Sequence, residues 1–179
     1  GFMEYYSLKN FNTMLKKEEK MNRITVIMSA LIVGACVALG SMVFAEMPGP
    51  DPDEIWEYIT KSSPYTDWAF WSDHQGVQPG RAPHGPLHKV YVNGRALNST
   101  KPPVQYGSIQ VKENYSKARE LKAITVMYKI PGYNPKDGDW FWVKYTPEGK
   151  AGPFGKPRGC IGCHGTRANN DFILVHEFK

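Results

Sequence analysis

Five residues near the C-terminal end of the chain, Cys160-Ile161-Gly162-Cys163-His164, form a C-x-x-C-H pentapeptide. Two thiols at this spacing can each bond to a vinyl group of one haem, and the adjacent histidine can coordinate the iron. A zinc half-site, a disulfide or a chance pair of cysteines are the alternatives. A zinc site would need two further ligands, and the sequence has no second pair of cysteines. The motif therefore predicts one covalently attached haem c with His164 as the iron ligand.

Arg158 and two methionines are further candidates for contact with a haem. Arg158 lies two residues before Cys160, where its guanidinium could pair with a haem carboxylate. A methionine ligand is not expected, because only Met47 and Met127 follow the leader described below. Met47 lies near the expected new N-terminus, and Met127 falls in a predicted central strand. This argues against a simple electron carrier, in which His/Met ligation raises the reduction potential.

Residues 21–45 have the pattern of an export signal. Met21-Asn22-Arg23 form a short basic start, residues 24–44 are an almost uncharged apolar run, and Val43-Phe44-Ala45 is a small-residue cleavage signal. Because haem is attached to C-x-x-C-H outside the cytoplasm, the leader and the motif support each other and predict a periplasmic protein. Residues 1–20 are expected to be an upstream extension that is not translated in the native protein.

Two other interpretations of this leader remain open. The apolar run of residues 24–44 is long enough to cross a bilayer as an uncleaved anchor. Val33-Gly34-Ala35-Cys36 is weakly similar to a lipoprotein box, although the apolar sequence continues past Cys36. Cleavage after Ala45 is the favoured interpretation.

Residues 46–179 are enough for one domain with a single hydrophobic core. Cys36 would leave with the signal, and Cys160 and Cys163 are committed to haem, so no disulfide is expected. The whole chain carries a formal net charge of +5, with both signs mixed along it. Because the sequence lacks a basic block and basic-aromatic interleaving, no nucleic-acid partner is expected. Some positive surface could help an acidic electron-transfer partner to dock.

The elements that must position the motif are mostly strands. Asp51 can cap, and Pro52 can begin, a short amphipathic helix over 52–62, inside an entry segment of residues 46–64. The haem-binding domain is expected to occupy residues 65–179. Alternating or β-branched apolar patterns predict strands at 87–93, 108–113, 121–130, 139–145 and 172–178.

Glycine and proline mark the connections between these strands. Loops are expected at 75–86, 131–138 and 146–159, a tight turn at Asn93-Gly94, and one short helical turn at the haem motif. The expected fold class is α+β and mainly antiparallel β: about five strands in a sheet, two or three short helices, and a c-type haem near the C-terminus.

Five stretches of sequence, taken in order, carry a resemblance to a known family. They are Gly80 to Asn93, Val111-Lys112-Glu113, Gly138 to Trp142, Cys160 to His164, and Asp171-Phe172. Together they resemble the cytochrome P-460 family, which includes cytochrome c′-beta, over about residues 65–178. The haem motif alone is common, but its combination with the other stretches is much more specific.

This resemblance implies a mostly β homodimer with one c-type haem, a proximal histidine and an open distal site for small nitrogen ligands. Cytochrome P-460 enzymes oxidise hydroxylamine, can couple it to nitric oxide, and carry an extra bond from a lysine nitrogen to a porphyrin meso carbon. Lys112 aligns with that lysine. Cytochrome c′-beta shares the fold without this cross-link and binds nitric oxide or carbon monoxide in an apolar pocket.

Lys112 is therefore the residue that separates these two activities. Alternation places it with Gln110 on the polar side of its strand, opposite Ile109 and Val111. A lysine on such a side is usually solvated, and only the resemblance directs it to a haem. Burial against a haem would favour the deprotonated, nucleophilic amine. Glu113 falls on the other side and is not expected to accept its proton.

Two histidines occupy the positions expected on the distal side. His84 stands where related proteins have an aromatic residue, and His88 where the hydroxylamine-oxidising enzyme has an arginine. Either could relay protons, since the histidine pKa of ~6.5 suits acid–base work, or could ligate the iron and close the site. Both could also be ordinary polar residues where a loop enters a strand. His74 and His176 are expected to be surface or core residues.

Three functions follow from these patterns. The first is a periplasmic oxidoreductase that acts on hydroxylamine or nitric oxide and passes electrons to a soluble protein. The second is a gas-binding cytochrome without turnover or cross-link. The third is an electron-transfer cytochrome in which His164 and a second histidine both ligate the iron, which would make it low-spin.

Overall fold

The computed structural model describes residues 17–18, 20–21 and 46–178 of the 179-residue chain. The chain divides into two units, residues 1–44 and 45–179, and the fold and site described below belong to the second. Among the described residues, no helix is both long and apolar enough to cross a membrane. The expected signal, anchor and lipoprotein segments lie, apart from Met21, outside the described residues.

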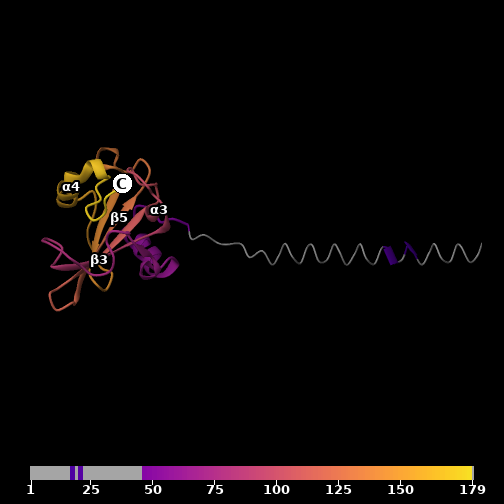
Figure 1. Ribbon diagram of the computed structural model, residues 1–179, viewed down its shortest axis with the longest axis horizontal. Helices are drawn as coiled ribbons and strands as arrows, with labels where there is room; N and C mark the ends of the chain where they lie inside the picture. Colours follow the sequence, from indigo (N-terminus) through magenta and orange to yellow (C-terminus); the bar gives the residue numbers. More distant parts are fainter. Residues whose placement is uncertain (1–16, 19, 22–45, 179) are drawn as a thin grey trace, which may run out of the picture. The chain divides into compact units, whose positions relative to one another are not determined.

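The domain is an α+β fold built on one antiparallel sheet, which confirms the expected class (Figure 1). The strands follow the order β1-β3-β4-β5-β6-β7, and β2 also pairs with β3. Their bounds are β1 Ala69–Phe70, β2 Gln78–Pro79, β3 Leu87–Val92, β4 Ile109–Tyr115, β5 Leu121–Lys129, β6 Trp140–Tyr145 and β7 Ala151–Gly155.

Short helices connect and cover this sheet. The α-helices are α2 Pro52–Glu57, α3 Gly94–Leu97 and α4 Arg158–His164. A π-helical turn, η1 Tyr58–Ser62, continues α2. Three 3₁₀ segments complete the set: η2 Tyr65–Asp67, η3 Pro135–Asp137 and η4 Gly165–Asn170.

The entry helix forms where its cap residues predict. Asp51 Oδ1 accepts hydrogen bonds from the backbone N–H groups of Asp53 and Glu54, and Pro52 occupies the first helical position. With η1, the helical stretch covers residues 52–62, as predicted. Ile55 and Ile59 are fully buried against the sheet. Burial of each such side chain stabilises the fold by ~1.5–3 kcal/mol.

The sheet has a covered face on each side, because alternate residues of a strand point to opposite sides. One face, with Val111 of β4, packs on α2 and η1. The other, with Trp142 of β6, packs under Phe172, α4 and the last residues of the chain. In Figure 1 the segment of α2 and η1 (purple) and α4 (yellow) accordingly lie on different sides of the strands.

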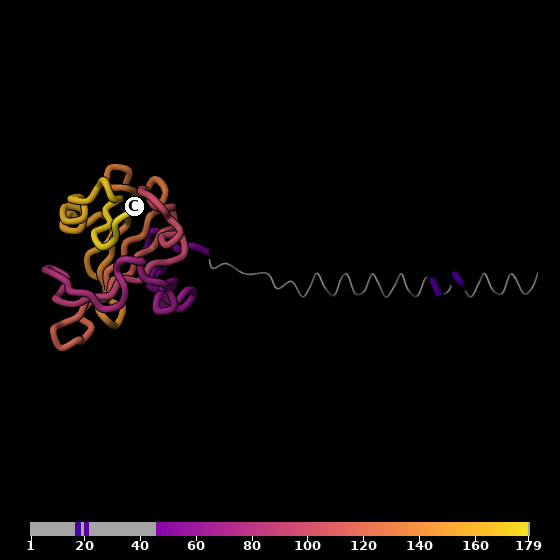
Figure 2. The backbone as a smooth tube through the Cα atoms, viewed as in Figure 1, coloured from indigo at the N-terminus to yellow at the C-terminus, as the bar shows by residue number. Residues whose placement is uncertain are grey.

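The predicted last strand over 172–178 is wrong, since this segment contains no strand. Asp171 and Phe172 adopt left-handed backbone angles, with φ of 51° and 63°, which interrupt an extended chain. The Asn170 side-chain amide then donates to the carbonyl oxygens of Ile173 and His176, which fills acceptors that a strand partner would use. The segment therefore folds back beside the sheet as an irregular chain, shown in yellow in Figure 2.

Three connections also differ from the sequence expectation. The predicted loop at 75–86 contains the two-residue strand β2, which pairs with β3. The predicted loop at 146–159 contains β7, which forms one edge of the sheet by pairing with β6. Asn93 does not form a hairpin turn with Gly94 but caps α3, because its Oδ1 accepts from the N–H groups of both Ala96 and Ile109. A local turn pattern cannot predict this hydrogen bond to Ile109, which is distant in the sequence.

Candidate functional site

The C-x-x-C-H residues lie on α4, which begins directly after Pro157. Cys160 and Cys163 are three residues apart and therefore lie on adjacent turns of one helical face. Cys160 is half-buried, and burial raises the pKa of its thiol, while Cys163 is exposed. The predicted short helical turn is confirmed, and it directs His164 toward the sheet from the C-terminal end of the helix.

His164 is oriented by the backbone of Phe172. Its Nδ1 lies 2.8 Å from the Phe172 carbonyl oxygen, and because a carbonyl can only accept, Nδ1 carries the proton. The other ring nitrogen, Nε2, is then the one able to bind a metal. Burial lowers the pKa of His164, against the opposite effect of this hydrogen bond, and so favours the neutral imidazole that metals require.

A buried ion pair holds this carbonyl in place. Lys129 Nζ lies 2.7 Å from Asp171 Oδ1, and both side chains are almost fully buried. Asp171 Oδ2 accepts from the Val104 N–H, and the Asp171 carbonyl accepts from Trp140 Nε1. These contacts fix the left-handed pair of residues that turns the Phe172 carbonyl toward His164.

A cavity with two adjoining parts lies between the sheet, α4, the 79–86 loop and the C-terminal segment. The first part leaves about 720 Å³ and the second about 1260 Å³ unfilled by protein atoms, some of it open to solvent. Cys160 and His164 line the first part, and Cys163 lines the second. Four residues line both: His84, Lys112, Leu174 and Val175.

Lys112 points into this cavity from the polar side of β4. In the register of the sheet it lies opposite Thr125 of β5, which in turn lies opposite Lys144 of β6, and all three line the first part. Burial lowers the pKa of Lys112, while the nearby Cys163 thiol acts in the opposite direction. The polar side of the strand is thus the cavity side, and this lysine is not an ordinary solvated one.

The cavity also brings together three of the histidines. His84 lines both parts, and burial, followed by the charge of Lys112, lowers its pKa to about 4. His88 and His74 line the second part. Burial and Lys112 likewise lower the pKa of His88 to about 4. His74 was expected to be an ordinary surface or core residue, but its Nε2 lies 2.7 Å from His88 Nε2.

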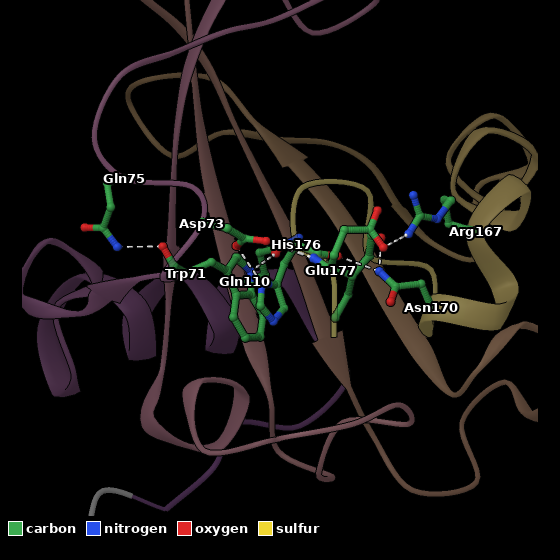
Figure 3. A network of polar contacts seen from close by, with 9 residues as sticks. Trp71, Asp73, Gln75, Gln110, Arg167, Asn170, His176 and Glu177 are labelled. Atoms are coloured by element: carbon green, nitrogen blue, oxygen red, sulfur yellow. Dashed lines mark hydrogen bonds and ion pairs between the residues drawn. The ribbon is translucent and has the colours of Figure 1, made fainter. Parts of the chain in front are cut away.

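The C-terminal segment forms one wall of the cavity and is fastened by Asp73. Asp73 Oδ1 pairs with His176 Nδ1 at 2.6 Å, and Oδ2 accepts from the Glu177 N–H at 3.0 Å. Figure 3 shows these contacts beside Trp71, whose ring stacks on that of His176 at 4.2 Å. His176, half-buried at this place, therefore helps to hold the wall.

Arg158 stands apart from this group. It is exposed on α4 and lines neither part of the cavity. By contrast, Met127 lines the first part, although the sequence placed it only in a strand. Its sulfur accepts from the Gln110 amide at 3.5 Å, and Gln110 Oε1 accepts from Trp71 Nε1 at 2.8 Å. Alternation places Gln110 on the same side of its strand as Lys112. This was the sequence signal that could have placed Gln110 beside the cavity.

The residues present fit a haem. The cavity is flanked by two thiols and an imidazole oriented with one ring nitrogen free, the donor set that a c-type haem needs. Trp142 lines the first part, and its buried Nε1 has no partner among the described residues, so it can donate to a polar group of a bound molecule. Among the same residues, no cluster of three or more His, Cys, Asp or Glu side chains forms a metal site.

Comparison with known proteins agrees with this geometry. The family model for cytochrome P-460 matches residues 62–175, which include the two thiols, His164, Lys112 and the cavity histidines. No curated protein matches the chain. Because the match spans more than half of the sequence, the chain belongs to the cytochrome P-460 family of haem-binding cytochromes, and the resemblance stated from the sequence is confirmed.

Proposed function

We propose that this member of the cytochrome P-460 family is a mono-haem c cytochrome that acts on hydroxylamine, nitric oxide or both. Cys160 and Cys163 hold the haem covalently, and His164 binds the iron through Nε2. One observation carries this proposal: Lys112 lines both parts of the cavity that also contains the three residues of the haem motif. A lysine at this place is what separates the cross-linked enzymes from the gas-binding proteins.

The haem supplies an iron centre at which a small nitrogen compound can bind and exchange electrons. Desolvation lowers the pKa of the half-buried Lys112, which favours the neutral amine that would be needed to form a bond to the porphyrin. His84 and His88, with pKa values of about 4, remain neutral near pH 7 and can accept protons released by the substrate. Electrons then leave to a partner protein.

The bis-histidine alternative rests first on His84. In His88, Nε2 is already engaged by His74, which leaves only the buried Nδ1 for iron. His84 lines both parts of the cavity and has no such partner among the described contacts, so it remains the ligand in this alternative. A low-spin ferrous spectrum that becomes high-spin in His84→Ala would establish this third function in place of the first.

The first test compares the purified holoprotein with Lys112→Ala. We expect a red-shifted ferrous Soret band and a tryptic fragment in which the Lys112 peptide is joined to the haem peptide, both lost in the variant. Lys144→Ala is the matched control, because Lys144 also lines the first part of the cavity. Hydroxylamine oxidation with an artificial electron acceptor is then measured on the three proteins.

Each outcome assigns a function. Loss of the shifted band and of hydroxylamine oxidation in Lys112→Ala, with the control unchanged, supports the enzyme. An ordinary high-spin spectrum that is identical in all three proteins overturns the cross-linked enzyme and supports a nitric oxide- or carbon monoxide-binding cytochrome, the second candidate.

We further propose that the protein is exported to the periplasm by residues 21–45 and works as a homodimer. Cleavage would leave an N-terminus at Glu46, which Edman or mass analysis of the protein from the periplasmic fraction can identify, whereas an anchored form would remain with the membrane fraction. Light scattering on the holoprotein measures the oligomeric state.

A further inference from the structure

A pair of hydrogen-bonded histidines connects the inside of the cavity to its outer edge. His88 Nε2 lies 2.7 Å from His74 Nε2, with the rings stacked 4.9 Å apart and inclined by 15°. Two nitrogens at this distance share one proton, since each ring can be either donor or acceptor. Neither the cytochrome family match nor the haem motif assigns any role to His74.

The two rings differ in burial, which gives the pair a direction. His88, on β3, is 4% exposed, and its buried Nδ1 has no partner among the described residues. His74, in the loop between β1 and β2, is only partly buried. Both line the second part of the cavity, together with Lys112 and Cys163. A buried ring, whose unpartnered Nδ1 lies beside the Gly80 backbone in the cavity wall, is thus joined to a partly exposed ring.

The charged residues around the pair disfavour a proton on His88, the more buried of the two rings. Beyond the effect of burial, Lys112 of β4, then His74 and then His84 of the loop lower the pKa of His88. At His74, the neighbouring Asp73 carboxylate acts in the opposite direction to burial and Lys112. The other charged or titratable residues that line this part of the cavity are Arg81, Arg167, His176 and Glu177. Burial lowers the pKa of both rings, but His74 has the Asp73 carboxylate beside it, which favours its protonated form and so favours outward transfer.

We infer that His88 and His74 form a proton relay between the haem cavity and solvent, with His74 as the outer positioning residue. The inference rests on the proposed function and deepens it. In one passage, His88 Nδ1 gains a proton from the cavity, the His88 Nε2–H bond breaks as its proton bonds to His74 Nε2, and the His74 Nδ1 proton leaves to water. One proton enters and one leaves, and no electrons move.

The test measures proton movement directly rather than turnover. The holoprotein is reduced rapidly in weakly buffered solution that contains a pH-indicator dye, and proton uptake or release is followed by stopped flow. We expect His74→Phe and His88→Phe each to slow this phase by about 100-fold, the lower end of what a positioned acid–base group contributes. High phosphate, a small mobile proton carrier, should restore the rate in His74→Phe but not in His88→Phe.

Gln75→Ala is the matched control. Gln75 is exposed in the same loop, and its Nε2 donates to the Trp71 carbonyl oxygen, so its removal loosens the loop without touching the pair (Figure 3). In Gln75→Ala, the phase of proton uptake or release should have the wild-type rate. Histidine ¹⁵N spectra of the carbon monoxide-bound ferrous protein give a second readout, in which His74→Phe shifts the His88 Nε2 resonance.

Three outcomes would overturn the relay: no proton phase in the wild type, an unchanged rate in His74→Phe, or a slow rate in that variant that phosphate does not restore. The last result would mean that His74 only supports the fold. Failure of the proposed function is distinguishable, because a protein without hydroxylamine oxidation would still show a proton phase that depends on His74.

Discussion

His164 Nδ1 donates a hydrogen bond of 2.8 Å to the carbonyl oxygen of Phe172, eight residues further along the chain. This bond selects the ring nitrogen that remains for iron and sets the orientation of the imidazole. Its acceptor is held by residues far away in sequence: Lys129, on β5, binds Asp171 beside it. The ligand geometry is therefore a property of the folded sheet and not of the helix that carries the histidine.

Breaking the Lys129–Asp171 pair should destabilise the protein strongly. Lys129→Met leaves the Asp171 carboxylate buried and unpaired, which costs about 3–5 kcal/mol. Urea unfolding of the holoprotein measures the loss, and the haem absorbance should change as His164 loses its fixed acceptor. Lys122→Met is the control: its pair with Glu120 is exposed, so its loss should cost less than about 1 kcal/mol. Equal costs in both variants would show that the buried pair has no special role.

Glu113 should matter for stability and not for the haem. It lies on the sheet face away from the cavity, as predicted, and accepts hydrogen bonds from Tyr65 and Tyr115. Burial, together with Glu113, raises the pKa of both tyrosines, so they stay protonated donors. Glu113→Gln should lower the free energy of unfolding by about 1.5–3 kcal/mol, as for lost hydrogen bonds to a charged group, and leave the haem spectrum unchanged. A changed spectrum would mean that Glu113 acts on Lys112.

Asp73 should keep the C-terminal wall of the cavity closed. Asp73→Ala removes the acceptors of both His176 Nδ1 and the Glu177 N–H. Exchange of the Glu177 amide hydrogen should become about tenfold faster, which corresponds to ~1.4 kcal/mol and lies within the range for a lost hydrogen bond. Glu57→Ala removes an exposed pair with Lys61 on the entry helix and should leave this amide unchanged. An unaffected Glu177 amide in Asp73→Ala would show that packing alone holds the segment.

The buried histidines should make the protein less stable in mild acid. The pKa values of His84 and His88 fall from 6.5 to about 4 on folding, so between these values the unfolded chain binds more protons. The free energy of unfolding should therefore be fully retained above pH 6.5 and fall as the pH decreases toward 4. Urea unfolding across this range should show a smaller decrease for His88→Gln than for the wild type. A curve that is flat from pH 7 to 4.5 would contradict buried neutral histidines.

Local pattern was sufficient for the central part of the fold. The strands around Val90, Val111, Val126 and Val143 follow from alternation and β-branching, because such residues suit a pleated surface that is buried on its faces. The Asp51 cap and the haem motif are equally local, since both depend on residues within one helical turn. The same reasoning failed where a residue has a partner that local pattern does not reveal. Asn93 caps a helix and also binds Ile109 instead of forming a turn, and Asn170 binds the last segment, which therefore does not form a strand.

The sequence by itself determined the haem motif, the family and the antiparallel α+β class, because each depends on residue types at short, fixed spacing. The tertiary structure alone decided which side of β4 meets the cavity, so that Lys112 is half-buried there while its alternation resembles that of a solvated lysine. It alone joined His74 to His88 and Phe172 to His164. These contacts depend on sheet register and on where an irregular C-terminal segment packs, and both result from many distant interactions summed over the whole domain.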